Sequence, residues 1–339
     1  MRGCPGAPRR RALRPRDTGG GCGEGARACD PPTPGQDPRH AGGTRRLVLE
    51  QLYNAIFIGS IYALFAVGFA LVFSVLDILN LAHPTVFMLG AFAALFAIGT
   101  LGLPWYVAVP FAVVASGLFG IALDRIAFAP LRRRGAPPLS AMISSLAVTL
   151  IVVRLVELRY GGDFITFPSG TVPSFLIRIG DATLEGVRLA IILLAVGLMA
   201  GLTFLVRQTQ LGRDIRALAE NPRAARILGV DVERAIAATF FISSALGGLA
   251  GVLLGFAYNS VDSKMGLPLE LRAFTVMVVG GMGSLPGAVV GAYVLGLGEV
   301  ASLVYLPAEL RDAFAFGLLF LVLIVRPTGL FGQRATDRA

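Results

Sequence analysis

Long apolar segments separated by short polar ones dominate the sequence. Eight of them have the composition of membrane spans, because a helix of about 20 apolar residues crosses the hydrocarbon core of a bilayer. They cover residues 51–75, 84–100, 104–128, 139–158, 187–206, 235–258, 272–304 and 311–325. We therefore predict an all-α, polytopic transmembrane helix bundle of 8 to 10 spans. The count depends on whether 272–304 or the first hundred residues divide further.

Two stretches interrupt the apolar pattern, one in each half of the chain. GFALVFSVLDILNLAHP covers residues 68–84, and GGMGSLPGAVVG covers residues 280–291. Paired broken helices are typical of inverted-repeat transporters whose pathway lies near the middle of the membrane. Glycines that let neighbouring helices pack closely explain the same pattern, so both interpretations stay open.

Composition supports an integral membrane protein. Of the 339 residues, 55% are hydrophobic and 15% are charged, and the mean hydropathy is +0.72. A soluble globular protein carries about 25% charged residues. Because basic loops stay in the cytoplasm, we place the arginines at 132–134 and the loop 207–234 on that side. The polar residues 159–186 then lie outside.

The first 46 residues differ from the rest of the chain. They hold ten arginines, four acidic residues and all three cysteines, with almost no large apolar residue. Such a segment has too little apolar surface to fold, and it has no apolar stretch of a secretory signal. We predict a disordered basic extension at 1–46, and we hypothesise that it is dispensable or spurious, with translation starting near Leu47 to Leu52. A transmembrane domain at 47–332 and a cytoplasmic tail at 333–339 complete the predicted organisation.

The basic loop contains a stretch that reads as two short helices. It begins at residue 212 with GRDIRALAENPRAARILGV. Asn221 is a favourable N-cap and Pro222 suits the first position of a helix, which predicts helices at 213–220 and 222–228. Gly229 suits the left-handed residue that closes a helix.

Each predicted helix has one apolar or small face. Spacing of three and four residues groups Ile215 with Leu218 and Ala219, and it groups Ala224 with Ala225 and Leu228. The arginines of the stretch lie largely off these faces: Arg213, Arg216, Arg223 and Arg226. Three interpretations remain open: a loop that only obeys the positive-inside rule, a helix lying on anionic lipid, and a docking element for a soluble partner.

Several motifs, in order along residues 50–332, resemble Liv-type permeases of branched-chain amino-acid ABC importers. These motifs are GSIYALFAVGFALVFSVLDILNLAH (59–83), LGRDIRALAENPRAARILGVDVERAIAATFFISSALGGLAGVL (211–253), FTVMVVGGMGSLPGAVVGA (274–292) and RPTGLFG (326–332). The run from Arg223 to Gly229 also resembles the EAA-x-x-x-G pattern of ABC importer permeases. Arginine replaces its glutamate, and the later Ile-x-Leu-Pro part is absent.

The resemblance implies a non-catalytic, multi-pass permease subunit in a bacterial inner membrane. Its implied partners are a second homologous permease subunit, two cytoplasmic ATP-binding subunits, an external substrate-binding protein and the lipid bilayer, but no nucleic acid. No P-loop motif is present, so no cofactor is expected in this chain and ATP binds to the partner. The residues implied to couple to the ATPase are Gly212, Arg213, Arg216, Ala219, Asn221, Pro222, Arg223, Ala224, Ala225 and Gly229.

Polar and glycine positions inside the apolar segments are candidates for the transport pathway. They are Asn54, Tyr62, Asn80, His83, Gly281, Gly283 and Ser284. His83 is the only histidine of the membrane body, and a packing role and a transport role both remain open. Liv-type chains commonly continue after this histidine with glycine and then often an acid, whereas this chain has Pro84-Thr85.

The sequence therefore predicts a permease that imports branched-chain amino acids and is coupled to an ATPase. The missing acid leaves room for urea, short-chain amides or other amino acids as substrates of the same scaffold. A stand-alone secondary transporter or channel is the alternative from another class, but it does not explain the basic helix pair. A membrane-embedded scaffold does not need the polar residues within the spans.

Overall fold

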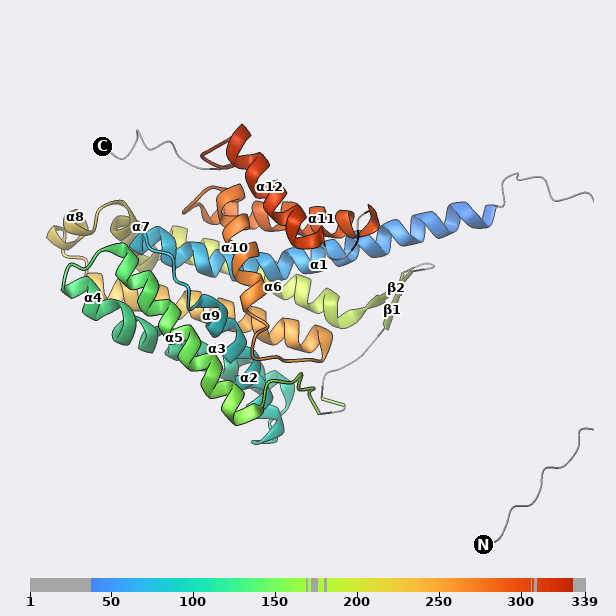
Figure 1. Ribbon diagram of the computed structural model, residues 1–339, viewed down its shortest axis with the longest axis horizontal. Coiled ribbons are helices and arrows are strands. Elements are labelled where there is room, and N and C mark those ends of the chain that lie inside the picture. Colours follow the sequence, from blue (N-terminus) through green and yellow to red (C-terminus); the bar gives the residue numbers. More distant parts are fainter. Residues whose placement is uncertain are drawn as a thin grey trace, which may run out of the picture. The chain divides into compact units, whose positions relative to one another are not determined.

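The chain is predominantly helical (Figure 1). The computed structural model describes residues 38–331 except 169, 172–175, 180–181, 306 and 308–309. The helices are α1 (Pro38–Leu76), α2 (His83–Gly99), α3 (Trp105–Leu123), the π-helix η1 (Asp124–Phe128), α4 (Ala129–Arg133), α5 (Pro138–Tyr160), α6 (Gly186–Gln208), α7 (Gln210–Glu220), α8 (Pro222–Ile227), α9 (Val232–Tyr258), α10 (Leu267–Gly280), α11 (Leu285–Tyr305) and α12 (Arg311–Val325). Most of the predicted extension at 1–46 and all of the predicted tail at 333–339 lie outside the described residues.

Six helical segments of the described chain are long and apolar enough to cross a membrane. They are Val48–Leu76, Trp105–Arg133, Pro138–Tyr160, Gly186–Gln208, Val232–Tyr258 and Leu285–Leu303. The apolar helix α2 has 17 residues, and α10 and α12 have 14 and 15. Three predicted spans therefore contain helices shorter than the thickness of a hydrocarbon core requires.

Both predicted interruptions are breaks between helices. Residues 77–82 separate α1 from α2, and Asp77 has a positive φ of 54° at the start of the break. The predicted segment 272–304 is divided into α10 and α11 by the four residues 281–284. The sequence left the second division open, and the structure resolves it as two helices.

Helix α1 is the most enclosed of the predicted spans. Most of its apolar stretch is buried inside the protein, whereas a third or less of the corresponding stretches of α3, α5 and α6 is buried. Since apolar side chains are stable against lipid tails, this distribution describes a central helix flanked by helices with lipid-facing surfaces.

Helices α2, α3 and α9 pack closely through small residues. A Cβ built on Gly90 of α2 would overlap the backbone of Gly248 in α9, and one on Gly120 of α3 would overlap Ser244. Small residues let helix backbones approach in a membrane. Glycine-mediated packing therefore operates beside the first helix break, so the two interpretations of the glycines are not exclusive.

The predicted all-α fold is confirmed, and one short hairpin accompanies the helices. Strands β1 (Leu176–Ile179) and β2 (Ala182–Glu185) form an antiparallel hairpin before α6. An isolated bridge also joins Ile165 to Val261. The sequence analysis took residues 159–186 as an irregular polar excursion, because strands of four residues are too short to show a clear alternation.

Candidate functional site

The predicted helix pair is present as α7 and α8, joined at Asn221 (Figure 1). The side-chain Oδ1 of Asn221 accepts hydrogen bonds from the backbone N–H groups of Arg223 and Ala224, at 3.0 and 3.1 Å. Pro222 occupies the first helical position, where a missing N–H group costs no hydrogen bond. The N-cap predicted from the sequence is confirmed, and it fixes the direction of α8 relative to α7.

Helix α7 begins three residues earlier than predicted, at Gln210. The side chain of Thr209 caps it by accepting a hydrogen bond from the N–H group of Gly212 at 3.1 Å. Ile215 and Leu218 are buried, as their spacing predicted. Helix α7 is therefore held through its apolar face.

Two contacts join α7 to the end of α6. A Cβ built on Gly212 would overlap the carbonyl groups of Leu205 and Val206, so only glycine fits there. The guanidinium of Arg216 donates a hydrogen bond to the carbonyl oxygen of Val206. Both contacts tie α7 directly to the backbone of the last turn of α6.

Helix α8 ends at Ile227, and Gly229 adopts the left-handed conformation with a φ of 85°. The N–H group of Val230 closes the end by bonding to the carbonyl of Ala225 at 3.0 Å. The predicted glycine end is confirmed. An L-residue with a side chain is strained at this φ.

The prediction that Ala224, Ala225 and Leu228 share one packed face of α8 was wrong for two of the three residues. Ala225 is buried, but Ala224 is exposed and Leu228 is 80% exposed. The neighbouring Ile227 is 86% exposed. Helix α8 therefore presents two large apolar side chains away from the protein, a feature that the sequence analysis missed because it placed Leu228 on the packed face.

The arginines of the helix pair all carry exposed side chains. Arg213, Arg216, Arg223 and Arg226 form no ion pair with an acid of the described chain. Ala219 is half-buried between them on α7. The arginines are thus available to acidic groups outside this chain, whereas the buried alanine of α8 and the apolar face of α7 anchor the pair.

Asn80 and His83 lie together at the break between α1 and α2. Both are buried; Oδ1 of Asn80 accepts from the N–H group of Ala82, and Nε2 of His83 lies 3.2 Å from the carbonyl oxygen of Phe65. Asn80 Nδ2 and His83 Nδ1 have no hydrogen-bond partner among the described residues. Gly68 leaves room for the imidazole ring on α1.

Tyr62 belongs to an ionic cluster around the buried Glu299, which lies in the C-terminal half of α11. Its hydroxyl donates to Glu299 Oε2 at 2.7 Å. Arg272 donates to the other carboxylate oxygen at 2.8 Å, and Arg311 donates to Oε2 at 2.9 Å. Asp312 accepts from Arg272 at 2.8 Å, so two arginines and two acids join α1, α10, α11 and α12.

The sequence analysis named Tyr62 but missed both arginines of this cluster. Arg272 and Arg311 each stand at the start of a predicted apolar segment. A charged residue in that position is usually interpreted as the boundary of a membrane span. The observation that could have found them is that Glu299, inside an apolar segment, needs a buried partner.

The remaining pathway candidates occupy two further places. Oδ1 of Asn54 accepts from Arg188 of α6 at 3.3 Å. Gly281 and Gly283 adopt positive φ values of 105° and 80° between α10 and α11, and Ser284 Oγ accepts from the N–H group of Gly287. The seven candidates therefore lie in four separate places and do not form one site.

The fold and the exposed helix pair define a multi-pass membrane protein with an anchored polar element at one end of its spans. A family model described as the permease component of the branched-chain amino acid transport system matches residues 51–323. The chain belongs to this family. It is a non-catalytic, multi-pass inner-membrane permease of a branched-chain amino acid ABC transport system.

Individual relatives agree with the family match. The high-affinity branched-chain amino acid transport system permease protein LivH of Salmonella typhimurium is 34% identical over 86% of this chain and 97% of its own length. BraD of Pseudomonas aeruginosa, with the same description, is 33% identical over the same shares. The probable branched-chain amino acid transport permease LivH of Methanocaldococcus jannaschii is 28% identical over 85% of this chain and 92% of its own.

Proposed function

We propose that this permease forms the translocation pathway for branched-chain amino acids and that α7 and α8 couple it to a cytoplasmic ATPase. The observation that carries the proposal is the exposed apolar end of α8. Ile227 and Leu228 project from a helix that Asn221 and Gly229 fix at both ends. Large exposed apolar side chains on an anchored helix are typical of a surface that packs into a partner's groove.

The proposed coupling follows the contacts of α7. When the ATPase closes on ATP, it displaces α8, and α7 moves with it. The contacts of Gly212 and Arg216 with the last turn of α6 pass this displacement to a predicted span. The other coupling candidates have distinct parts: Asn221 and Pro222 set the angle, Ala225 anchors α8, and Arg213, Arg223 and Arg226 face the partner.

We propose that the two helix breaks flank the pathway. Helix α2 starts at His83 and α11 starts just after Gly283, so backbone groups near each break lack regular helical partners. Such groups occur at membrane depth where they are buried in protein or line a cavity. Asn80 and Ser284 supply polar side chains at these breaks, and Gly281 lets the second break bend. Asn54 and Tyr62 lie further back on α1, where they contact Arg188 and Glu299.

The proposed complex contains two homologous permease subunits, two ATP-binding subunits and an external binding protein. ATP binds to the cytoplasmic subunits and no cofactor binds to this chain. In this arrangement the shorter helices α2, α10 and α12 add partial crossings to the six full-length ones, which supports the predicted total of 8 to 10.

The proposal is tested with the assembled transporter in proteoliposomes. Leu228→Asp places a charge on the exposed end of α8 and is expected to abolish leucine uptake and binding-protein-stimulated ATP hydrolysis, while the chain still inserts into the membrane. Leu228→Met keeps an apolar side chain and is the matched control. Full uptake by Leu228→Asp would remove the coupling assignment.

The same assay distinguishes the alternatives. Competition by unlabelled leucine, isoleucine and valine supports branched-chain amino acids as substrates, whereas competition by urea or short-chain amides would reassign the substrate. Uptake by this chain without ATP-binding subunits would support a stand-alone transporter and contradict the proposal.

A further inference from the structure

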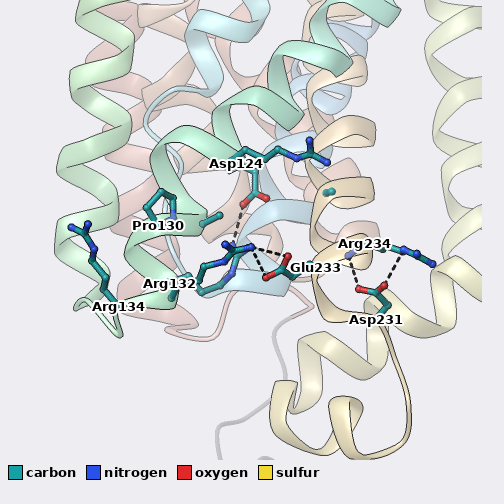
Figure 2. A pocket seen from close by; sticks show the side chains of 11 residues that line it. Asp124, Pro130, Arg132, Arg134, Asp231, Glu233 and Arg234 are labelled. Carbon is teal, nitrogen blue, oxygen red and sulfur yellow. Dashed lines mark hydrogen bonds and ion pairs between the residues drawn. The ribbon is translucent and has the colours of Figure 1, made fainter.

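A polar cavity lies where the π-helix η1 and α4 meet the start of α9 (Figure 2). Its volume is about 700 Å³. Five arginines and three acidic residues line it, together with three alanine or proline residues. The cavity is separate from the exposed end of α8 and from the four places that hold the pathway candidates.

Three of the five arginines are paired with acids. Arg132 donates to the buried Asp124 at 3.0 Å. Arg133 of α4 donates to both carboxylate oxygens of Glu233 in α9 at 3.0 Å, which closes one side of the cavity. Arg234 pairs with Asp231 within the first turn of α9. In each pair the two charges neutralise one another.

Two arginines of the cavity remain without an acid. Arg125 and Arg134 are exposed and form no ion pair with the part of the chain that the structure describes. The cavity therefore carries an excess of two positive charges. Guanidinium groups match the geometry of phosphate oxygens, so an anion with phosphate chemistry is the complementary ligand.

The surface beside the cavity is apolar. Ile126, next to Arg125 on the π-helix, is 74% exposed, and Leu139 and Ile143 of α5 are exposed as well. A hydrogen bond of 3.3 Å from Ser144 of α5 to the carbonyl of Ala127 shows that α5 packs on η1. One ligand can thus reach both a basic cavity and a lipid-facing apolar surface.

The π-helix itself points to a site. Five-residue π segments are rare and occur frequently where a helix serves a function. Within this segment Asp124 is buried, while its neighbours Arg125 and Ile126 are exposed. A regular positive-inside loop needs arginines but neither a cavity nor a change of helix type.

We propose that this cavity binds the phosphodiester headgroup of an anionic phospholipid, with the acyl chains lying on Ile126 and α5. Basic pockets between helices at the cytoplasmic side of a membrane recognise such headgroups. A soluble phosphate offers the same charge but gains nothing from the apolar surface. A contact with the ATPase does not use that surface either.

The test is a titration of the purified, delipidated full chain in detergent, read by native mass spectrometry. Cardiolipin and phosphatidylcholine are the lipid probes, and inorganic phosphate is the soluble probe. The variant is Arg125→Gln/Arg134→Gln. The matched control is Arg207→Gln/Arg326→Gln, which removes two exposed arginines away from the cavity.

Cardiolipin is expected to bind the wild type and the control with equal affinity. Its affinity for the cavity variant is expected to be lower by roughly tenfold or more. Phosphatidylcholine is expected to show no such difference, and inorganic phosphate is expected not to displace cardiolipin. An equal loss of cardiolipin affinity in the cavity variant and the control variant would show that binding depends only on general surface charge, which would overturn the proposal. Displacement by inorganic phosphate would assign a soluble anion instead. Unchanged cardiolipin binding to the cavity variant would also overturn the proposal.

Discussion

At the scale of single residues, the carboxylate of Glu299 is a fully buried charge that needs ionic and hydrogen-bond partners. It lies fully buried between the guanidinium groups of Arg272 and Arg311. A buried charge is tolerated when it is paired and hydrogen-bonded, and Tyr62 supplies a further hydrogen bond. Four helices are thus tied together by one carboxylate.

We expect Glu299→Gln to destabilise the protein by about 3 kcal/mol, because it removes the fully buried charge that two half-buried guanidinium groups share. Asp312→Asn is the matched control, since Asp312 contacts the same Arg272 but is exposed. It is expected to cost below about 1 kcal/mol. Thermal unfolding in detergent measures both, and equal shifts would contradict the assigned importance of burial.

Gly229 gives a second prediction at this scale. Its φ of 85° strains any residue with a side chain, although asparagine tolerates this conformation better than most. Gly229→Arg is expected to abolish ATP-coupled uptake and Gly229→Asn to retain much of it. Equal uptake by both variants would show that the end of α8 does not need this geometry.

At the scale of elements, the helix pair was the most predictable feature. Asn221, Pro222 and Gly229 each carry a local reason for their position, so capping and termination could be read from neighbouring residues. The exposed face could not be read in this way. Whether Ala224 or Ala225 is buried depends on α9, which the sequence does not place.

This difference between two adjacent alanines can be measured. Ala225 is buried and Ala224 is exposed. Ala225→Asp buries an unpaired charge and is expected to detach α8, so that trypsin cleaves after Arg223 and Arg226 several times faster than in the wild type. Ala224→Asp adds the same charge without burying it and is expected to leave the cleavage rate unchanged. Equal acceleration would contradict the anchoring role.

At the scale of the whole molecule, hydropathy placed most of the helices within a few residues, although α1 begins at Pro38 and not at 51. It did not show which helices are enclosed. Lipid-facing and protein-facing helices are equally apolar, so α1 and α5 look alike in sequence, although 89% of the apolar window of α1 is buried and only 22% of that of α5. The ionic cluster was missed for a related reason, because its members lie on four helices.

The charge pattern was more informative at this scale. The basic residues 132–134 and the first turn of α9, directly after the helix pair, line one cavity, so the two segments predicted to be cytoplasmic meet at one end. The hairpin lies at the other end of the helices in Figure 1. The side of the membrane that each end faces stays a prediction.

The central claim is that the exposed end of α8 docks into the ATPase. Photo-cross-linking in the assembled transporter tests it most directly, with benzoylphenylalanine replacing Leu228 in one protein and Leu158 in another. Both positions are at least 80% exposed, but Leu158 lies near the C-terminal end of α5, two residues before Tyr160. We expect a cross-link from position 228 to the ATP-binding subunit, changed in yield by ATP, and none from position 158. No cross-link from position 228, or equal cross-links from both positions, would contradict it.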